Sequence, residues 1–201
     1  MSVSRHRVAA VSGVGASALS FGGIVLAVAL APWFSLTDNA LSDLGVADSA
    51  AVATAFNWGL ILAGLVALPY AWVLWTSASG SRGRVDSLVA RAVAVGFALA
   101  ALLMSAVGVF PSGDPLHFPV AAGFYLALTA VVGVDGLRRW RTTTGKAAVA
   151  GAVGHLGQWW LYVEGVRLGP GLAIPELVGA GLLVAWVVAG SPVAPLGRAG
   201  R

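Results

Sequence analysis

The 201-residue chain contains no cysteine, and only 10% of its residues are charged. The absence of cysteine excludes disulfide bonds, thiol nucleophiles and cysteine-ligated zinc or iron–sulfur sites. A soluble globular domain carries about 25% charged residues, so this chain has too little polar surface to be one. The chain also lacks an HExxH sequence, a nucleophile elbow and a phosphate-binding loop. Apolar residues, by contrast, make up 58% of it.

The apolar residues fall into six long runs, and each run has the length of a transmembrane helix. About 20 apolar residues, rising 1.5 Å each, cross the hydrocarbon core of a bilayer. The runs cover residues 8–31, 52–75, 88–110, 118–137, 147–167 and 174–190. We therefore predict an all-α fold: a six-transmembrane-helix bundle that forms a single membrane domain over residues 1–201, as a multi-pass protein of the cell membrane.

The charged residues are distributed unequally between the loops, and this predicts the orientation of the chain. With the N-terminus in the cytoplasm, eleven of the twelve basic residues are cytoplasmic and only Arg167 is external. Six of the eight acidic residues are then external. The positive-inside rule therefore predicts that the N- and C-termini are both cytoplasmic. The net charge of +4 is an orientation signal, and no nucleic-acid partner is expected because the chain has no clustered basic face.

The first apolar run has some features of a secretory signal peptide. Arg5 and Arg7 precede it, and the tripeptides Ala-Val-Ala and Ala-Leu-Ala lie near its end. Its length of about 24 residues exceeds the 7–15 residues of an ordinary signal-peptide core. We expect the first span to be retained, and its cleavage would leave five spans with the same loop orientation.

The external loops carry the densest set of polar side chains. This external polar cluster comprises Asn39, Ser42, Asp43, Asp114, His117, Glu164 and Glu176. Carboxylates beside an imidazole can bind a divalent metal ion or act as a general acid–base pair. The candidate metal ligands are Asp43, Asp114 and His117, and the candidate catalytic residues are Ser42, Asp43 and His117. Helix capping and turn formation explain the same residue types, and we favour that explanation.

A second polar set lies within the membrane spans. His155, Gln158 and Tyr162 share one face of the fifth span because residues three, four and seven apart align on a helix. We favour a neutral, buried His155 that is bonded to another helix, and a proton relay or polar substrate path is the alternative. The polar residues considered as its partners on other spans are Asn57, Ser105 and Thr129.

Asp135 is followed three and four residues later by Arg138 and Arg139. This spacing predicts a local ion pair on one helix face, at the membrane interface. The basic loop 138–146 is expected to face anionic headgroups, at about 1 kcal/mol per basic residue. We interpret both features as membrane anchoring.

Three short motifs resemble a known family. Leu-Ser-Asp-Leu-Gly at residues 41–45 is similar to the signature of a prokaryotic and archaeal six-helix membrane family, domain of unknown function 998. Phe-Asn-Trp-Gly at residues 56–59, and Phe110-Pro111 with His117-Phe118, look similar too. The resemblance covers roughly Gly22 to Ala185. At greater distance the layout resembles the Frag/DRAM/Sfk group, which has a Ser-Asp-x-Gly loop after the first span and a histidine near the start of the fourth.

The resemblance implies a role connected with membrane lipids, because the distant group is tied to lipid remodelling, lipid asymmetry and autophagy. The positions that match the shared motifs are Ser42, Asp43, Gly45 and His117. The leading hypothesis is therefore a lipid-interacting, non-catalytic membrane protein with an acidic external face. The alternatives are a membrane-embedded, metal-assisted lipid hydrolase or transferase, and a small transporter that uses His155 and Gln158. No cofactor is evident, although a divalent metal ion fits the second hypothesis. The expected partners are membrane lipids, and a second copy of the chain or another membrane protein is considered beside them.

Overall fold

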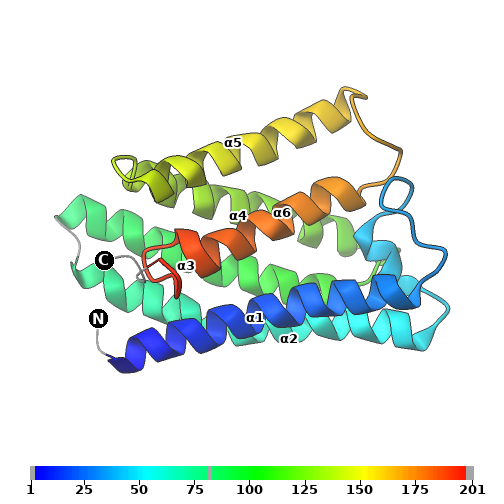
Figure 1. The fold of residues 1–201 in the computed structure, drawn as a ribbon, viewed down its shortest axis with the longest axis horizontal. Coiled ribbons are helices and arrows are strands. Elements are labelled where there is room, and N and C mark those ends of the chain that lie inside the picture. Colours follow the sequence, from blue (N-terminus) through cyan, green and yellow to red (C-terminus); the bar gives the residue numbers. More distant parts are fainter. Residues whose placement is uncertain (1–2, 81–82, 198–201) are drawn as a thin grey trace.

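The computed structural model describes residues 3–80 and 83–197. In this part of the chain six α-helices follow one another in alternating directions (Figure 1). They are α1 (Val3–Leu30), α2 (Ala50–Ser77), α3 (Arg84–Val109), α4 (His117–Arg138), α5 (Thr143–Val163) and α6 (Ala173–Ala185). Three short elements complete the chain: the 3-10 helices η1 (Leu41–Val46) and η2 (Ala78–Gly80), and the π-helical turn η3 (Trp186–Gly190) that extends α6.

The helices pack against their neighbours in the sequence, and glycines allow two of these pairs to approach closely. A Cβ atom on Gly23 would lie 2.7 Å from the carbonyl oxygen of Ala55, so α1 and α2 touch backbone to backbone. A Cβ atom on Gly64 would lie 2.2 Å from the carbonyl oxygen of Ala101, which brings α2 and α3 into the same kind of contact. Small residues at helix crossings are the usual way in which membrane helices associate.

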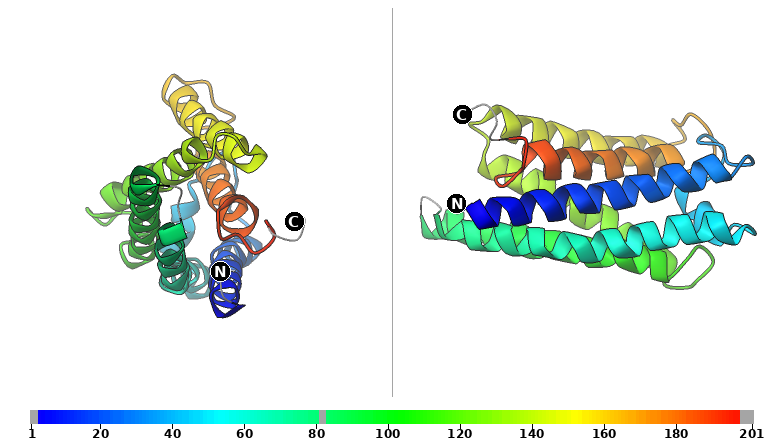
Figure 2. Two further views of the ribbon diagram at one scale, coloured as in Figure 1. Left: turned by 90° about the vertical axis from the view of Figure 1, so that its left-hand side faces the viewer. Right: turned by 60° about the horizontal axis from the view of Figure 1, so that its bottom comes forward.

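The two ends of the bundle differ in charge. One end, the acidic end, carries loops 31–49, 110–116 and 164–172 and the first turn of α6, which together hold all six acidic residues expected outside the cell. The other, the basic end, carries loop 139–142, the start of α1 and the end of η3, so the described chain begins and ends on the same side (Figure 2).

Five helices of the described chain are long and apolar enough to cross a membrane. They cover Ser4–Leu30, Ala50–Gly80, Arg84–Val109, His117–Arg138 and Ala173–Gly190. The helix α5 is 21 residues long, about 31 Å at 1.5 Å per residue, but its sequence is more polar and it is not among the five. It lies beside α4 and α6 (Figures 1 and 2).

The fifth helix starts and ends four residues earlier than the apolar run 147–167 predicts. It ends because Gly165 adopts a positive φ of 84°. The N–H of Val166 then donates to Leu161 O at 2.9 Å, and the N–H of Gly165 donates to Tyr162 O at 3.1 Å. This pair of bonds is the Schellman motif, which closes many helices at a left-handed glycine.

The outer surface of the bundle is rich in large apolar side chains. Val11, Val25, Leu126, Leu137 and Trp160 are each more than half exposed. Such a surface on a water-soluble monomer would promote aggregation, whereas it suits contact with lipid hydrocarbon. With the long apolar helices, it is the surface of an integral membrane protein.

Candidate functional site

The motif at residues 41–45 forms η1, which folds into the acidic end of the bundle. Leu41 and Leu44 anchor it, since they are 4% and 0% exposed. The carboxylate of Asp43 accepts the N–H of Ala40 at 2.9 Å and the side-chain amide of Asn39 at 3.4 Å. Asp43 therefore stabilises the turn into its own helix, which is the capping role that short polar residues often play.

Gly45 and Asn57 connect two of the short sequence motifs directly. The side-chain amide of Asn57 on α2 donates to Gly45 O at 2.9 Å. A Cβ atom on Gly45 would lie 2.6 Å from Asn57 Oδ1 and 3.2 Å from Phe56 Cδ1. A side chain at position 45 would therefore displace Asn57, and glycine lets η1 approach α2 closely. The hydrogen bond from Asn57 links the two elements.

Main-chain hydrogen bonds join the first and last loops of the acidic end. The N–H of Gly171 donates to Thr37 O at 2.7 Å, and the N–H of Ala173 donates to Asn39 O at 2.9 Å. The N–H of Leu41 donates to Glu176 Oε2 at 2.6 Å. Glu176 is only 7% exposed, so its carboxylate lies inside the bundle and links α6 to η1.

His117 lies in the first turn of α4, next to the turn that Asp114 organises. Its Nδ1 is 2.8 Å from Phe110 O. A carbonyl oxygen only accepts hydrogen bonds, so in neutral His117 Nδ1 carries the proton and Nε2 is an acceptor. The carboxylate of Asp114 accepts the N–H of Leu116 at 2.8 Å. Asp114 therefore forms a turn of the kind expected for this residue type.

A cavity of about 70 Å³ extends from the acidic end into the bundle, between α1, α2, α3, α4 and α6. Ser42, His117 and Glu176 line its end at η1, and we call these three residues the polar end of the cavity. Further in, the lining is largely apolar, with side chains such as Ile24, Leu60, Phe97, Met104, Phe124 and Leu183. The hydroxyls of Ser17 and Ser20 on α1 donate to carbonyl groups of their own helix. The cavity is therefore amphipathic along its length.

The structure separates the residues of the external polar cluster into four groups. Ser42, His117 and Glu176 meet at the cavity, while Asn39 and Asp43 shape the loop before η1. Asp114 belongs to a separate turn, and Glu164 is an exposed cap residue of α5. Among the described residues, no three histidine or acidic side chains form a group that could hold a metal ion.

The polar face of α5 is bonded to its neighbours. His155 is 1% exposed. Its Nδ1 is 2.7 Å from Thr129 Oγ1, and its Nε2 accepts the indole N–H of Trp159 at 3.0 Å. Gln158 donates to Pro175 O at 3.0 Å. His155 and Gln158 do not line the cavity that contains Ser42, His117 and Glu176.

Of the three polar residues considered as partners of His155, the structure selects Thr129. The other two make different bonds, since Asn57 donates to Gly45 O and Ser105 donates to Ile61 O at 2.9 Å. The hydroxyl of Thr129 donates to Tyr125 O at 2.6 Å, so it accepts from the Nδ1–H of His155. Both ring nitrogens of His155 are therefore satisfied in the neutral form.

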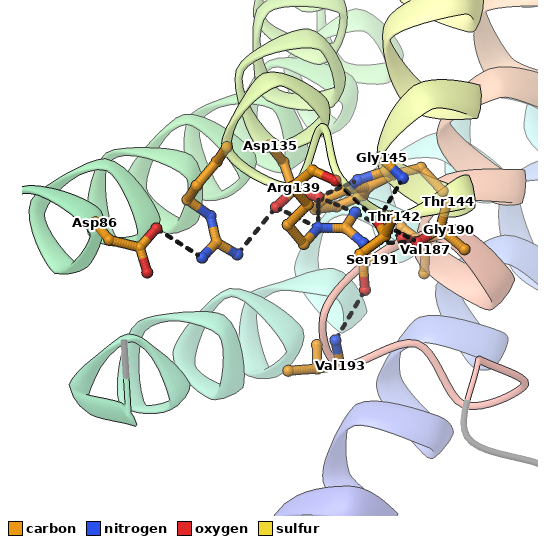
Figure 3. Close-up of polar contacts among 12 residues, drawn as sticks. Asp86, Asp135, Arg139, Thr142, Thr144, Gly145, Val187, Gly190, Ser191 and Val193 are labelled. Atoms are coloured by element: carbon orange, nitrogen blue, oxygen red, sulfur yellow. Dashed lines mark hydrogen bonds and ion pairs between the residues drawn. The ribbon is translucent and has the colours of Figure 1, made fainter. Parts of the chain in front are cut away.

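A second polar cluster, centred on Asp135, lies at the basic end (Figure 3). Asp135 bonds Arg138 at 3.2 Å and also pairs with Arg139, as the sequence spacing predicts. Asp135 is 0% exposed, so the ion pair is enclosed by protein near the C-terminal end of α4 and packs against η3. The indole N–H of Trp186 donates to its Oδ2 at 2.9 Å, and Arg139 donates to Gly190 O at 2.7 Å.

The sequence predicts the pairs of Asp135 with Arg138 and Arg139, but it does not predict the other contacts of the Asp135 cluster, because they join distant segments. Arg138 also pairs with Asp86 on α3 at 3.3 Å. Nearby, the hydroxyl of Tyr70 on α2 bonds Val187 O at 2.6 Å and Ser191 Oγ at 2.5 Å. No spacing rule connects these positions.

Comparison with known proteins gives one match. The model of a family described as "Protein of unknown function (DUF998)" matches residues 14–191. No curated protein and no solved structure matches the chain, so the distant resemblance to the Frag/DRAM/Sfk group stays a prediction. The matched region contains η1, His117 and Asn57, whose side chain bonds Gly45. The chain is a member of the DUF998 family.

Proposed function

We propose that this protein binds membrane lipid without transforming it, by taking an acyl chain into the amphipathic cavity. The observation that carries the proposal is the distribution of its lining. Ser42, His117 and Glu176 lie at one end, and apolar side chains from five helices line the rest. A lipid has the same distribution, with a polar head and an apolar chain.

The proposed orientation places the acidic end outside and both termini in the cytoplasm, with α5 as a sixth span. The basic end carries residues such as Arg5, Arg7, Arg139 and Arg141, and basic residues are retained on the cytoplasmic side. The length of α5 supports its role as a span, because about 20 helical residues cross the hydrocarbon core. Its polar side chains face partner helices, as the bonds of His155 and Gln158 indicate.

Selection of a lipid by this cavity depends mainly on its polar end. An acyl chain in a bilayer already contacts hydrocarbon, so its transfer into an apolar cavity gains little from the hydrophobic effect. Hydrogen bonds and charge at the head group, together with the shape of the cavity, then decide which lipid binds. A cavity of about 70 Å³ holds only a few methylene groups. An entering acyl chain must therefore push the lining helices apart, and one chain is favoured over two.

The contacts of the candidate catalytic residues favour binding over catalysis. A nucleophile needs a base within hydrogen-bonding distance, and no hydrogen bond connects Ser42 to His117 in the described part of the chain. Asp43 and Asp114 hold turns. The transporter alternative is also less favoured, because His155 is bonded on both nitrogens and lies outside the cavity.

Photo-crosslinking tests the proposal. The protein in nanodiscs is irradiated with a lysophospholipid that carries a diazirine on its acyl chain, and labelled peptides are identified by mass spectrometry. Labels are expected on cavity residues such as Met104 and Phe124. Ala121→Trp fills the cavity and should abolish this labelling, whereas Ala130→Trp, on the exposed face of the same helix, should leave it unchanged. Labelling confined to the outer surface, or equal in both variants, would refute the proposal.

A further inference from the structure

We infer that the cavity selects a lipid whose head carries a protonated primary amine, with Glu176 as the counter-ion. This inference rests on the proposed function and names the chemical class of its ligand. It concerns a site formed by three side chains from separate elements: Ser42 on η1, His117 on α4 and Glu176 on α6.

Glu176 is the charged side chain of the cavity. Among the described residues of the lining, none is lysine or arginine. The carboxylate accepts the N–H of Leu41 at 2.6 Å, and no ion pair of Glu176 occurs within residues 3–80 and 83–197. A buried carboxylate without a cation is costly in an apolar environment. A ligand with a positive charge removes this cost, and an anionic head group increases it.

The surroundings of the cavity mouth add to the negative field. The acidic side chains near it include Asp43 in η1, whose carboxylate bonds Ala40 and Asn39. Arg167 is the basic residue of this end, and its guanidinium lies over the ring of Tyr162, 5.3 Å from the centroid. The available cation at this end is therefore engaged with an aromatic ring on α5.

The polar end of the cavity consists mainly of hydrogen-bond acceptors. Glu176 is a carboxylate, and Nε2 of His117 is an acceptor because Nδ1 donates to Phe110 O. The hydroxyl of Ser42 can also accept. A primary ammonium group supplies three N–H donors, which matches three acceptors. A trimethylammonium group supplies no N–H donor. A phosphate group supplies further acceptors, which do not pair with the acceptors of the cavity.

Two kinds of lipid carry this chemistry: single-chain long-chain amines, and lipids with an ethanolamine head group. Both present an ammonium group on an apolar chain, but only the ethanolamine lipid carries a phosphate beside the ammonium. The experiment therefore includes one competitor of each kind. Competition by the amine alone, by the ethanolamine lipid alone or by both identifies the source, and each result supports recognition of the ammonium.

Competition against the diazirine lysophospholipid tests the inference in nanodiscs of neutral, amine-free lipid. The competitors share one chain length: a primary alkylamine, its mono-, di- and trimethylated forms, lysophosphatidylethanolamine and lysophosphatidylglycerol. The primary amine, the lysophosphatidylethanolamine or both should compete at least tenfold better than the trimethylated amine and the lysophosphatidylglycerol. Stepwise methylation should weaken competition stepwise, and this series needs no variant protein.

Glu176→Gln preserves the size of the side chain and the acceptor for Leu41, but removes the charge. It should abolish the tenfold preference, whereas Glu164→Gln, which changes an exposed carboxylate of the same end, should preserve it. Labelling of the cavity with no head-group preference, or a preference retained in Glu176→Gln, overturns this inference and leaves lipid binding intact. The absence of any labelling within the cavity refutes the proposed function itself.

Discussion

Replacement of Asp135 by asparagine should destabilise the protein strongly. The carboxylate is fully buried and receives hydrogen bonds from Arg138, Arg139 and Trp186. Asparagine has nearly the same shape but no charge, and its amide group turns a donor toward these donors. Removing one partner of a buried ion pair costs about 3–5 kcal/mol, because the remaining charge stays buried without compensation.

For a chain of this size, 1 kcal/mol corresponds to about 2–4 °C in the midpoint of thermal unfolding. The expected loss for Asp135→Asn is therefore roughly 6–20 °C on the same scale. Size-exclusion chromatography after heating in mild detergent measures the midpoint, and tryptophan fluorescence reports on the packing of Trp186. The emission should shift to shorter wavelength in the variant before any unfolding, because the buried indole N–H loses its charged acceptor.

Asp86→Asn is the matched control. Its carboxylate pairs with Arg138 at 3.3 Å but is 32% exposed, and partly exposed pairs contribute about 0–1 kcal/mol. Its midpoint should fall by no more than a few degrees. If both variants lose the same small amount, Asp135 does not stabilise the association of α4 with α6, and the reasoning is refuted.

Three further results are expected. Gly45→Ala should cost about 1–3 kcal/mol, because the added carbon overpacks against Asn57 Oδ1 at 2.6 Å; a thermal midpoint equal to that of the wild type contradicts this. His155→Ala should lower the free energy of unfolding by about 2–5 kcal/mol, since it leaves a void and an unpaired Trp159 N–H. The folded fraction should retain lipid labelling. A selective loss of labelling would place His155 on the ligand path. Hydrogen bonds from Ser35 and then Thr37 lower the pKa of Asp38 below 3.8. The contribution of Asp38 to stability is therefore present above the unfolded pKa and is lost as the pH falls through the folded pKa. The difference in thermal midpoint between wild type and Asp38→Asn should then vanish in strong acid. A difference that persists there shows that it does not come from the ionised Asp38 carboxylate.

The sequence predicts the helices well because each span is encoded locally. Apolar runs determine where α1 to α4 lie, and proline and glycine mark their ends. The sequence places the end of α5 less accurately. The predicted span continues to Arg167, whereas the helix ends at Val163 because Gly165 adopts a positive φ.

The candidate site was predicted only in part, because burial depends on contacts between distant loops. Glu176 follows Pro175 and resembles an ordinary first-turn acid of a helix. It is buried because the loop before η1 folds onto α6, which no local pattern encodes. Ser42 and His117 were predicted as members of the external polar cluster, and their shared cavity follows from the packing of five helices.

The bond between Leu41 and Glu176 joins residues 135 positions apart, and this separation has a consequence for biogenesis. A chain emerging from the ribosome inserts α1 and η1 long before α6 exists, so the polar end of the cavity cannot form until the last hairpin enters the bilayer. Until then the N–H of Leu41 on η1 has no Glu176 carboxylate to receive it and stays open to water or to the insertion machinery. The proposed lipid site and the fold are therefore completed in the same event, and a nascent chain that stops before Glu176 should bind no lipid in this cavity.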